Sequence, residues 1–169
     1  AANYIEHPEL EPPFMGLVVS GGHTNIINVK SYNTCEKLGS TRDDAAGEAF
    51  DKVARVIGLG YPGGPKVDKA AKNGDKDAVV FKRVYLEQGS YDFSFSGLKT
   101  AALNYINTER QAGRDINVND VAAGFQEAIV EVLVDKAVGA ALEFDQKRIV
   151  MAGGVASNSR LRELISERA

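Results

Sequence analysis

The pattern of apolar and polar residues places a group of strands before a longer helical part. Phe14 to Ser20 is a short, mostly apolar run with β-branched residues, which predicts a buried strand. Gly21-Gly22 interrupts this run, and His23 to Lys30 predicts a second strand that forms a hairpin with the first around the glycines. Thr34 to Leu38 is expected to add a third strand.

Helical spacing begins after these strands. Apolar residues recur every three or four positions from Asp43 to Ile57, which predicts an amphipathic helix capped by Thr41 or Asp43 and ended by Gly58-Leu59-Gly60. The other expected helices are Lys66 to Lys72, closed by Asn73-Gly74, then Ser96 to about Glu109 with Ser96 as its cap, and Asn117 to Asp145 with Asn117 as its cap.

The last part of the chain returns to a strand followed by a helix. Arg148 to Ala152 predicts a short buried strand, Gly153-Gly154 a turn, and a further helix begins at about Ser157. The alternating aromatic residues of Tyr91 to Phe95 suit either a half-buried strand or base stacking, and the strand is favoured. The order of elements predicts an α/β protein with a helical insertion.

Composition narrows the class of protein. The chain has 169 residues with 44% hydrophobic and 25% charged residues, which suits one globular domain or two small lobes. It contains no apolar run long enough for a membrane span and its first residues lack a signal-peptide pattern, so we expect a cytoplasmic protein that does not enter a membrane. The single cysteine, Cys35, is expected to be an inert thiol. With a net charge of −3, any contact with RNA needs a local basic patch or a partner.

Two glycine turns are the strongest candidates for ligand binding. The turn at Gly21-Gly22 lets a ligand approach the backbone and can form a nest for phosphate oxygens, although a plain glycine hairpin has the same pattern. The turn at Gly153-Gly154 lies between a strand and a helix, where ligands of open α/β sheets bind. Asn158 then either contacts a ligand or simply caps the helix.

Acidic residues and histidines give weaker signals. Asp44, Glu48 and Asp51 share one helix face, where they can hold ribose hydroxyls or a metal, but solvated acids are the favoured interpretation. His7 and His23 have no metal-ligand spacing, so we expect no metal bound wholly by this chain.

Taken together, the motifs resemble the bacterial TsaD family of tRNA adenosine threonylcarbamoyltransferases, formerly called O-sialoglycoprotein endopeptidases or glycoproteases. The resemblance covers nearly the whole chain from Phe14 and rests on five segments in the family's order: LVVSGGHTNI, DDAAGEAFDKVAR, YPGGP, DFSFSGLKT and MAGGVASNSRLR.

The resemblance implies a partial actin/Hsp70/sugar-kinase-like (ASKHA) fold. It also implies an acyltransferase that moves the threonylcarbamoyl group from threonylcarbamoyl-adenylate to the exocyclic amine of the adenosine beside the anticodon, in tRNAs reading ANN codons, with release of AMP. The partners implied are tRNA, a paralogous scaffold subunit and a small ATPase subunit. It implies residues 1–40 as the end of the N-terminal lobe, 41–145 as the helical region of the family insertion and 146–169 as the start of the C-terminal lobe.

The family's substrate-binding positions carry over residue by residue, whereas no catalytic residue is assigned. Asp51, Gly64 and Asp68 are expected on the ribose and base side, and Gly21, Gly22 and Asn158 around the phosphate and its acyl group. The complete set of expected binding residues is Val18, Val19, Ser20, Gly21, Gly22, Asp51, Gly64, Asp68 and Asn158.

The sequence departs from the family pattern in its metal site. The family binds iron or zinc through two histidines of an HxxxH helix and a later aspartate, which are expected before Ala1 and after Ala169. The chain is therefore expected to be a fragment that is inactive alone, with Ala1 to Tyr4 as the end of a helix.

Two alternative functions stay open at this stage. One is a related carbamoyltransferase of the same fold, and the other is a non-catalytic nucleotide-binding scaffold subunit. Basic residues that are candidates for RNA phosphate contacts, or are merely solvated, are Lys82, Arg83, Lys147, Arg148, Arg160 and Arg162.

Overall fold

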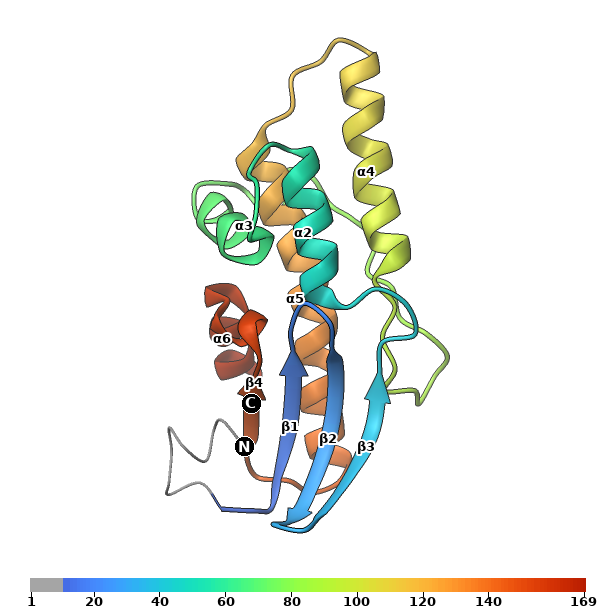
Figure 1. Cartoon of the computed structure of the whole chain (residues 1–169), viewed down its shortest axis with the longest axis vertical. Coiled ribbons are helices and arrows are strands. Elements are labelled where there is room, and N and C mark those ends of the chain that lie inside the picture. Colours follow the sequence, from blue (N-terminus) through green and yellow to red (C-terminus); the bar gives the residue numbers. More distant parts are fainter. Residues whose placement is uncertain (1–10) are drawn as a thin grey trace.

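The computed structural model describes residues 11–169, in which one mixed sheet lies against a group of helices (Figure 1). The expected helix end at Ala1 to Tyr4 and the residue His7 lie outside the described residues. The strands are β1 (Phe14–Val19), β2 (Thr24–Ser31), β3 (Thr34–Ser40) and β4 (Ile149–Ala152). The helices are α2 (Ala46–Val56), α3 (Gly63–Ala71), α4 (Ser96–Gln111), α5 (Val118–Glu143), the short 3₁₀ helix η1 (Gly154–Ser157) and α6 (Ser159–Arg168).

The sheet has the strand order β3-β2-β1-β4. Strands β1 and β2 form the predicted antiparallel hairpin, in which Val19 faces Thr24 across the glycine turn. Strand β3 extends the hairpin, so the third predicted strand is confirmed. Strand β4 pairs with β1 in parallel, but its side chains are only half-buried, so the prediction of a buried strand is wrong in this respect. The reason is its position at an edge of the described sheet.

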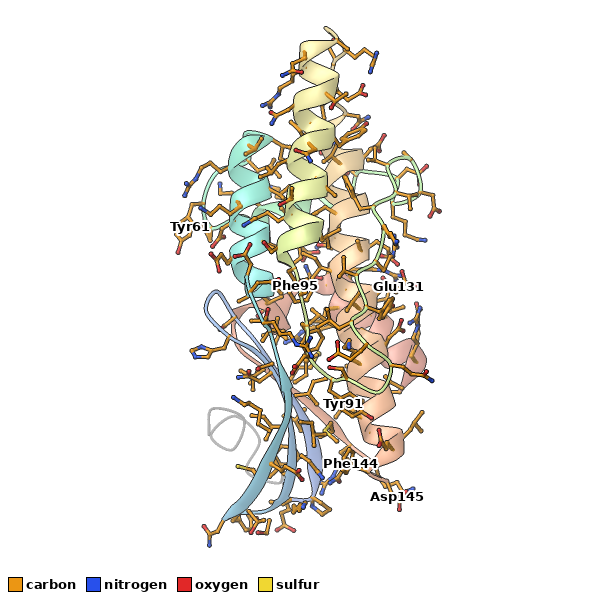
Figure 2. The ribbon with its side chains drawn as sticks, turned by 90° about the vertical axis from the view of Figure 1, so that its right-hand side faces the viewer. Tyr61, Tyr91, Phe95, Glu131, Phe144 and Asp145 are labelled. Atoms are coloured by element: carbon orange, nitrogen blue, oxygen red, sulfur yellow. The ribbon has the colours of Figure 1, made fainter. Side chains whose placement is uncertain are left out.

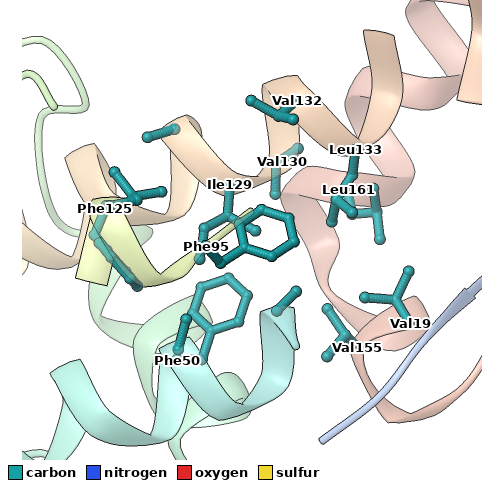
Figure 3. Packing of buried hydrophobic residues seen from close by; sticks show 14 of the residues in the cluster. Val19, Phe50, Phe95, Phe125, Ile129, Val130, Val132, Leu133, Val155 and Leu161 are labelled. Atoms are coloured by element: carbon teal, nitrogen blue, oxygen red, sulfur yellow. The ribbon is translucent and has the colours of Figure 1, made fainter. Parts of the chain in front are cut away.

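Helix α5 is the centre of the hydrophobic core. It is 26 residues long and buried on nearly every side through its middle, which is the pattern of a core helix rather than a surface helix. It contacts β1, α3 and α6. Figure 3 shows Phe125 and Ile129 of α5 near Phe50 of α2 and Phe95, and the rings of Phe50 and Phe125 meet edge to face at 5.9 Å.

The apolar cluster takes side chains from all three expected segments of the chain. The division into residues 1–40, 41–145 and 146–169 stays a prediction. None of the helices in residues 11–169 has both the length and the apolar character that a membrane span requires.

Two predicted helix caps are wrong, and one carboxylate explains both. The residue before α2 is Ala45, which has no capping side chain, and the Ala46 amide donates instead to Thr24 Oγ1 at 3.0 Å. Asp43 turns away to the start of α4, where its Oδ1 accepts from the amides of Phe95 at 2.9 Å and Ser96 at 3.2 Å. Ser96 is therefore the first residue of α4 rather than its cap.

The cap of α5 and the ends of α2 follow their sequence signals more closely. Asn117 Oδ1 accepts from the Asp120 amide at 3.1 Å, which confirms the predicted cap. Gly58 and Gly60 both have φ of +84°, a conformation that suits glycine at a helix end, and they follow α2 as predicted. Helix α3 begins at Gly63, three residues before the predicted start.

The predicted strand over Tyr91 to Phe95 is wrong. Only a single bridge forms, between Thr41 and Phe93. Phe93 and Phe95 are instead buried in the core with their rings stacked at 5.8 Å. Their burial also removes these two rings from any role in base stacking.

The contact between Gly153 and strand β1 generates a stability prediction. Gly153 has φ of +96°, and a Cβ added there would lie 2.2 Å from the Val19 carbonyl oxygen, whereas a Cβ on Gly154 would meet nothing within 4 Å. We expect Gly153→Ala to destabilise the protein by about 2–5 kcal/mol, from backbone strain and overpacking. Gly154→Ala is the matched control and should change stability by less than about 1 kcal/mol, as urea unfolding of both variants will show; equal losses would contradict the account.

The Asp43 contacts generate a prediction about pH. Burial raises the pKa of the Asp43 carboxyl, but hydrogen bonds from the Ser94 hydroxyl and the Phe95 and Ser96 amides outweigh it and hold the pKa below its ordinary value. Because the folded-state pKa is lowered, the stabilisation is present above the unfolded pKa of about 3.9 and is lost as pH falls through the folded value.

We therefore expect Asp43→Asn to cost about 1–2 kcal/mol at pH 7, and the deficit to shrink below about pH 4. Thermal unfolding across pH measures it. Asp115→Asn, at an exposed acid, is the control and should have little effect at any pH. A deficit for Asp43→Asn that is unchanged at low pH would contradict the assignment.

Candidate functional site

A cavity of about 410 Å³ opens at the carboxyl ends of β1 and β4, between helices α2 and α3 on one side and η1 and the start of α6 on the other. Its lining residues come from distant parts of the chain. They are Gly21, Gly47, Asp51, Tyr61, Pro62, Gly64, Pro65, Asp68, Lys69, Lys72, Gly154, Val155, Ser157 and Asn158.

The parallel pairing of β1 and β4 is what brings the two glycine turns together. Val18 faces Ala152 in the register, so both strands end at the same edge of the sheet. Gly21 and Gly154 consequently line the same cavity, so the two candidate glycine turns belong to one site. This is the position at which open α/β sheets bind ligands.

The glycines around the cavity divide into two kinds. An added Cβ on Gly47 or Gly63 would lie 2.6 Å from neighbouring backbone, so these residues allow chain segments to pack closely. An added Cβ on Gly21, Gly64 or Gly154 would meet nothing within 4 Å. The second kind leaves space at the cavity wall where a ligand can approach the backbone.

The hairpin turn contributes less to the cavity than the sequence indicated. Of the predicted stretch, Gly21 lines the cavity, whereas Val18, Val19, Ser20 and Gly22 do not. Val19 is buried in the core, and the Ser20 hydroxyl accepts from the His23 amide at 3.1 Å, which closes the turn.

Asp51 and Asp68 stand on the helical wall of the cavity, and both also hold the fold. Asp51 Oδ1 accepts from the Gly63 amide at 2.8 Å and so fixes the start of α3. Asp68 accepts from the Ser159 amide at 3.0 Å and from its hydroxyl at 2.6 Å, which joins α3 to α6. A carboxylate has about four acceptor sites, so each retains capacity for a ligand hydroxyl.

Asn158 was expected either to contact a ligand or to cap the helix, and its position is compatible with both. Its Oδ1 accepts from the Leu161 amide at 2.9 Å, so the residue caps α6, and it also lines the cavity. The Asn158 side chain and the Asp68 carboxylate accept hydrogen bonds from the first amides of α6, so the protein's own groups occupy this helix start.

Two consecutive residues of α5, which the sequence did not single out, hold this helix start in place. Gln126 accepts from Asn158 Nδ2 at 2.8 Å in a buried hydrogen bond. Glu127 receives the Arg160 guanidinium through two bonds of 2.8 and 2.9 Å. Burial raises the pKa of the Glu127 carboxyl, but the Arg160 contact outweighs it and lowers that pKa. The sequence pattern that could have identified Gln126 and Glu127 is a pair of polar residues within an otherwise apolar helix.

Of the three acids expected on one face of α2, only Glu48 and Asp51 lie on the helix. Asp44 precedes the helix and pairs with Lys99 of α4, while Glu48 is exposed and does not line the cavity. Only Asp51 faces the cavity. The helix begins three residues later than the periodicity indicated, which removes Asp43 and Asp44 from its surface.

Most basic residues named as phosphate contacts have protein partners instead. Arg83 pairs with Glu131 at 2.7 Å, and Lys147 pairs with Asp145 at 2.7 Å. Arg160 pairs with Glu127, while the guanidinium groups of Arg148 and Arg162 donate to backbone carbonyls. Lys82 is exposed and lies away from the cavity.

Sequence reasoning missed several residues at the cavity mouth. Tyr61 lines the cavity although its side chain is 76% exposed, and Lys69 of α3 and Lys72, directly after this helix, add positive charge. Their signal was available, because three lysines recur at three-residue spacing from Lys66 to Lys72.

The described residues offer no cluster of side chains for a metal. Within residues 11–169, no three His, Cys, Asp or Glu side chains gather in a way that fits a metal ion. The described residues therefore do not fit the family's metal, and no chemical step is derived through it.

Comparison with solved structures confirms the α/β fold class. One solved structure that the chain resembles is (R)-2-hydroxyglutaryl-CoA dehydratase component A of Acidaminococcus fermentans. The TM-score is 0.54 at 20% identity, and the likeness covers 98% of this chain and 54% of that chain. At this identity the likeness concerns the fold alone, and it supports a partial actin/Hsp70/sugar-kinase-like architecture.

Sequence comparison gives much closer relatives. The chain is 59% identical over its full length to a tRNA N6-adenosine threonylcarbamoyltransferase of Clostridioides difficile, covering 50% of that protein. It is 57% identical over 98% of its length to the same enzyme of Clostridium botulinum, covering 48% of that protein. The chain thus spans about half the length of the curated relatives it matches.

A family model agrees with these relatives along the whole chain. It matches residues 1–169 and describes TsaD, tRNA N6-adenosine threonylcarbamoyltransferase. The match identifies the family and leaves no support for the related carbamoyltransferase. With motifs, fold and relatives in agreement, the chain belongs to the TsaD family.

Proposed function

We propose that this chain is part of an enzyme that transfers a threonylcarbamoyl group from threonylcarbamoyl-adenylate to the N6 amine of an adenosine in tRNA, and that the cavity holds the adenylate. The observation that carries the proposal is the convergence of Gly21, Asp51, Gly64, Asp68 and Asn158 on one cavity. The cavity's volume of about 410 Å³ is in the range of small-molecule sites.

The lining suggests how the adenylate lies. The carboxylates of Asp51 and Asp68 can accept hydrogen bonds from ribose hydroxyls, and charge-assisted bonds of this kind are the stronger ones. Gly21 and Gly154 leave room for the phosphate and its acyl group beside the strand ends. Asn158, whose amide is held by Gln126 and by the Leu161 amide, is a further polar residue of the lining.

The proposed transfer is an acyl substitution at the carbamoyl carbon. The N6 amine attacks this carbon, a new C–N bond forms, the C–O bond to the phosphate breaks, and AMP leaves while the amine loses a proton. The described residues bind and orient the adenylate, and none is assigned as a catalytic acid or base. Holding the two reactants in register supplies much of the rate in such reactions.

The metal and the partner subunits that the family resemblance implies concern the full-length protein. We propose that the full-length protein holds one divalent metal, iron or zinc, through residues outside this chain, and acts with a scaffold subunit and a small ATPase subunit in the cytoplasm. A non-catalytic scaffold is the alternative class. Binding of threonylcarbamoyl-adenylate by the full-length protein, measured by calorimetry, with no transfer to tRNA when the partner subunits are present, would favour that alternative.

Asp51 gives a test that separates binding from folding. In the full-length protein, Asp51→Asn should weaken binding of AMP by about 10- to 100-fold, since a charge-assisted hydrogen bond of roughly 1.5–3 kcal/mol is lost. The asparagine keeps a carbonyl oxygen for the Gly63 amide, so the melting temperature should stay close to that of the parent protein. Calorimetric titration and thermal unfolding measure both quantities.

Asp51→Ala removes both the charge and the Gly63 contact, and should lower affinity and stability together. If Asp51→Asn leaves the affinity for AMP unchanged, Asp51 is structural and its role in the site is wrong.

A second prediction concerns the chain as it stands. Mixed with threonylcarbamoyl-adenylate, the partner subunits and unmodified tRNA, we expect no transfer, because the chain spans about half of its relatives and its described residues contain no metal-ligand cluster. Nucleoside analysis of the digested tRNA measures the product, with the full-length protein as the positive control. Turnover by the chain comparable to that control would refute the prediction.

A further inference from the structure

The distribution of unpaired cations is uneven. Across residues 11–169, most Lys and Arg side chains have an acidic partner or donate to a backbone carbonyl, as Arg42, Arg83 and Arg160 do. Among residues 11–169, the cations with neither kind of partner are Lys37, Lys52, Arg55, Lys66, Lys69, Lys72 and Lys82. Most of them lie on α2 and α3, the two helices that form one wall of the cavity.

The lysines of α3 form a row that reaches the cavity. Lys66, Lys69 and Lys72 are spaced three residues apart, which places neighbours on adjoining turns of one helix side. All three are exposed, and Lys69 and Lys72 line the cavity. Asp68, the acid within this row, is engaged by Ser159 and does not pair with them. The row therefore keeps its positive charge for an external anion.

An exposed aromatic ring lies beside these lysines, at the same side of the cavity. Tyr61 precedes α3, lines the cavity and is 76% exposed. Figure 2 shows it at the margin of the molecule beside α2. Large exposed rings next to cations are how proteins bind single-stranded nucleic acid, because bases stack on the ring while the cations contact phosphates.

We propose that one surface binds the single-stranded loop of the substrate tRNA. This surface, here called the α3 rim, consists of Tyr61, Lys66, Lys69 and Lys72. This inference rests on the proposed function. Sequence-specific RNA recognition mostly uses unpaired loops whose bases stack on aromatic side chains. With a net charge of −3, contact with RNA needs a local basic patch or a partner, and the α3 rim is such a patch.

The α3 rim suits RNA better than the adenylate. The adenylate has a single phosphate, which the proposed function places beside Gly21 and Gly154 at the strand ends. A row of three lysines exceeds what one phosphate needs, and Lys66 lies beyond the residues that line the cavity. A chain of phosphates running across the cavity mouth accounts for the whole row.

The test uses the full-length protein and unmodified tRNA, with affinity measured over a range of salt concentrations. For Lys69→Ala/Lys72→Ala we expect affinity to fall on the order of tenfold at low salt, and the slope of log K against log salt to become shallower by about 1 to 1.5. Lys69→Arg/Lys72→Arg keeps the charge and should retain most of the affinity.

The matched control is Lys30→Ala/Lys37→Ala, which removes the same charge from exposed positions on β2 and β3 away from the cavity. It should change affinity by less than about twofold. An equal loss in the control and in Lys69→Ala/Lys72→Ala would overturn the proposal, since the effect would then be one of total charge.

Tyr61 is tested by Tyr61→Ala and Tyr61→Phe. Loss of stacking on one base should weaken tRNA binding by about 5- to 100-fold in Tyr61→Ala, while Tyr61→Phe keeps the ring and the affinity. Thermal unfolding of both variants shows whether the fold is retained. Wild-type affinity in Tyr61→Ala would remove the ring from the proposed surface.

Binding of AMP separates this inference from the proposed function. Lys66→Ala removes the α3 rim residue that lies outside the cavity lining, so it should weaken tRNA binding while AMP binds as in the parent protein. A parallel loss of AMP affinity in Lys66→Ala would assign the lysines to the adenylate and overturn the inference. If the parent protein transfers nothing, the proposed function fails, but the tRNA affinities still decide whether the α3 rim binds RNA.

Discussion

The site depends on the close approach of Gly153 to strand β1. The Cβ of any other residue at this position would lie 2.2 Å from the Val19 carbonyl oxygen, so only glycine lets β4 end directly beside β1. The parallel register then continues into two turns at one sheet edge. Gly21 and Gly154, which are far apart in the sequence, meet across a single cavity because of this contact.

The residues of the cavity wall serve the fold and the site together. Asp51 fixes the start of α3, Asp68 joins α3 to α6, and Asn158 caps α6 while Gln126 holds its amide. A ligand in the cavity would meet groups whose positions are already set by buried or part-buried hydrogen bonds, so little ordering remains on binding. The same arrangement means that truncation to alanine mixes two effects. Conservative variants that keep one hydrogen bond are needed to separate them.

Local patterns in the sequence predicted the elements whose causes are local. The β1–β2 hairpin, the length of helix α5 and the Asn117 cap all follow from residues a few positions apart. The predictions were wrong where residues distant in the sequence determine the local structure. Asp43 caps a helix that begins more than fifty residues later, and Phe93 and Phe95 are buried in the core instead of forming a strand. The family's motifs named Asp51, Gly64 and Asp68 as binding residues, and all three line the cavity. Tyr61, Lys69 and Lys72 were recognised only from the lining of the cavity in the structure.

Filling the cavity tests the central claim, that this space holds the adenylate. A Cβ on Gly64 would meet nothing within 4 Å, so Gly64→Leu in the full-length protein directs a large side chain into the cavity without a backbone clash. Gly97→Leu, at an equally open position on α4 away from the cavity, is the control. The account predicts that Gly64→Leu lowers AMP affinity more than about tenfold, a loss of roughly 1.4 kcal/mol, while its unfolding midpoint stays close to that of Gly97→Leu. Full AMP affinity in a folded Gly64→Leu protein would contradict the claim.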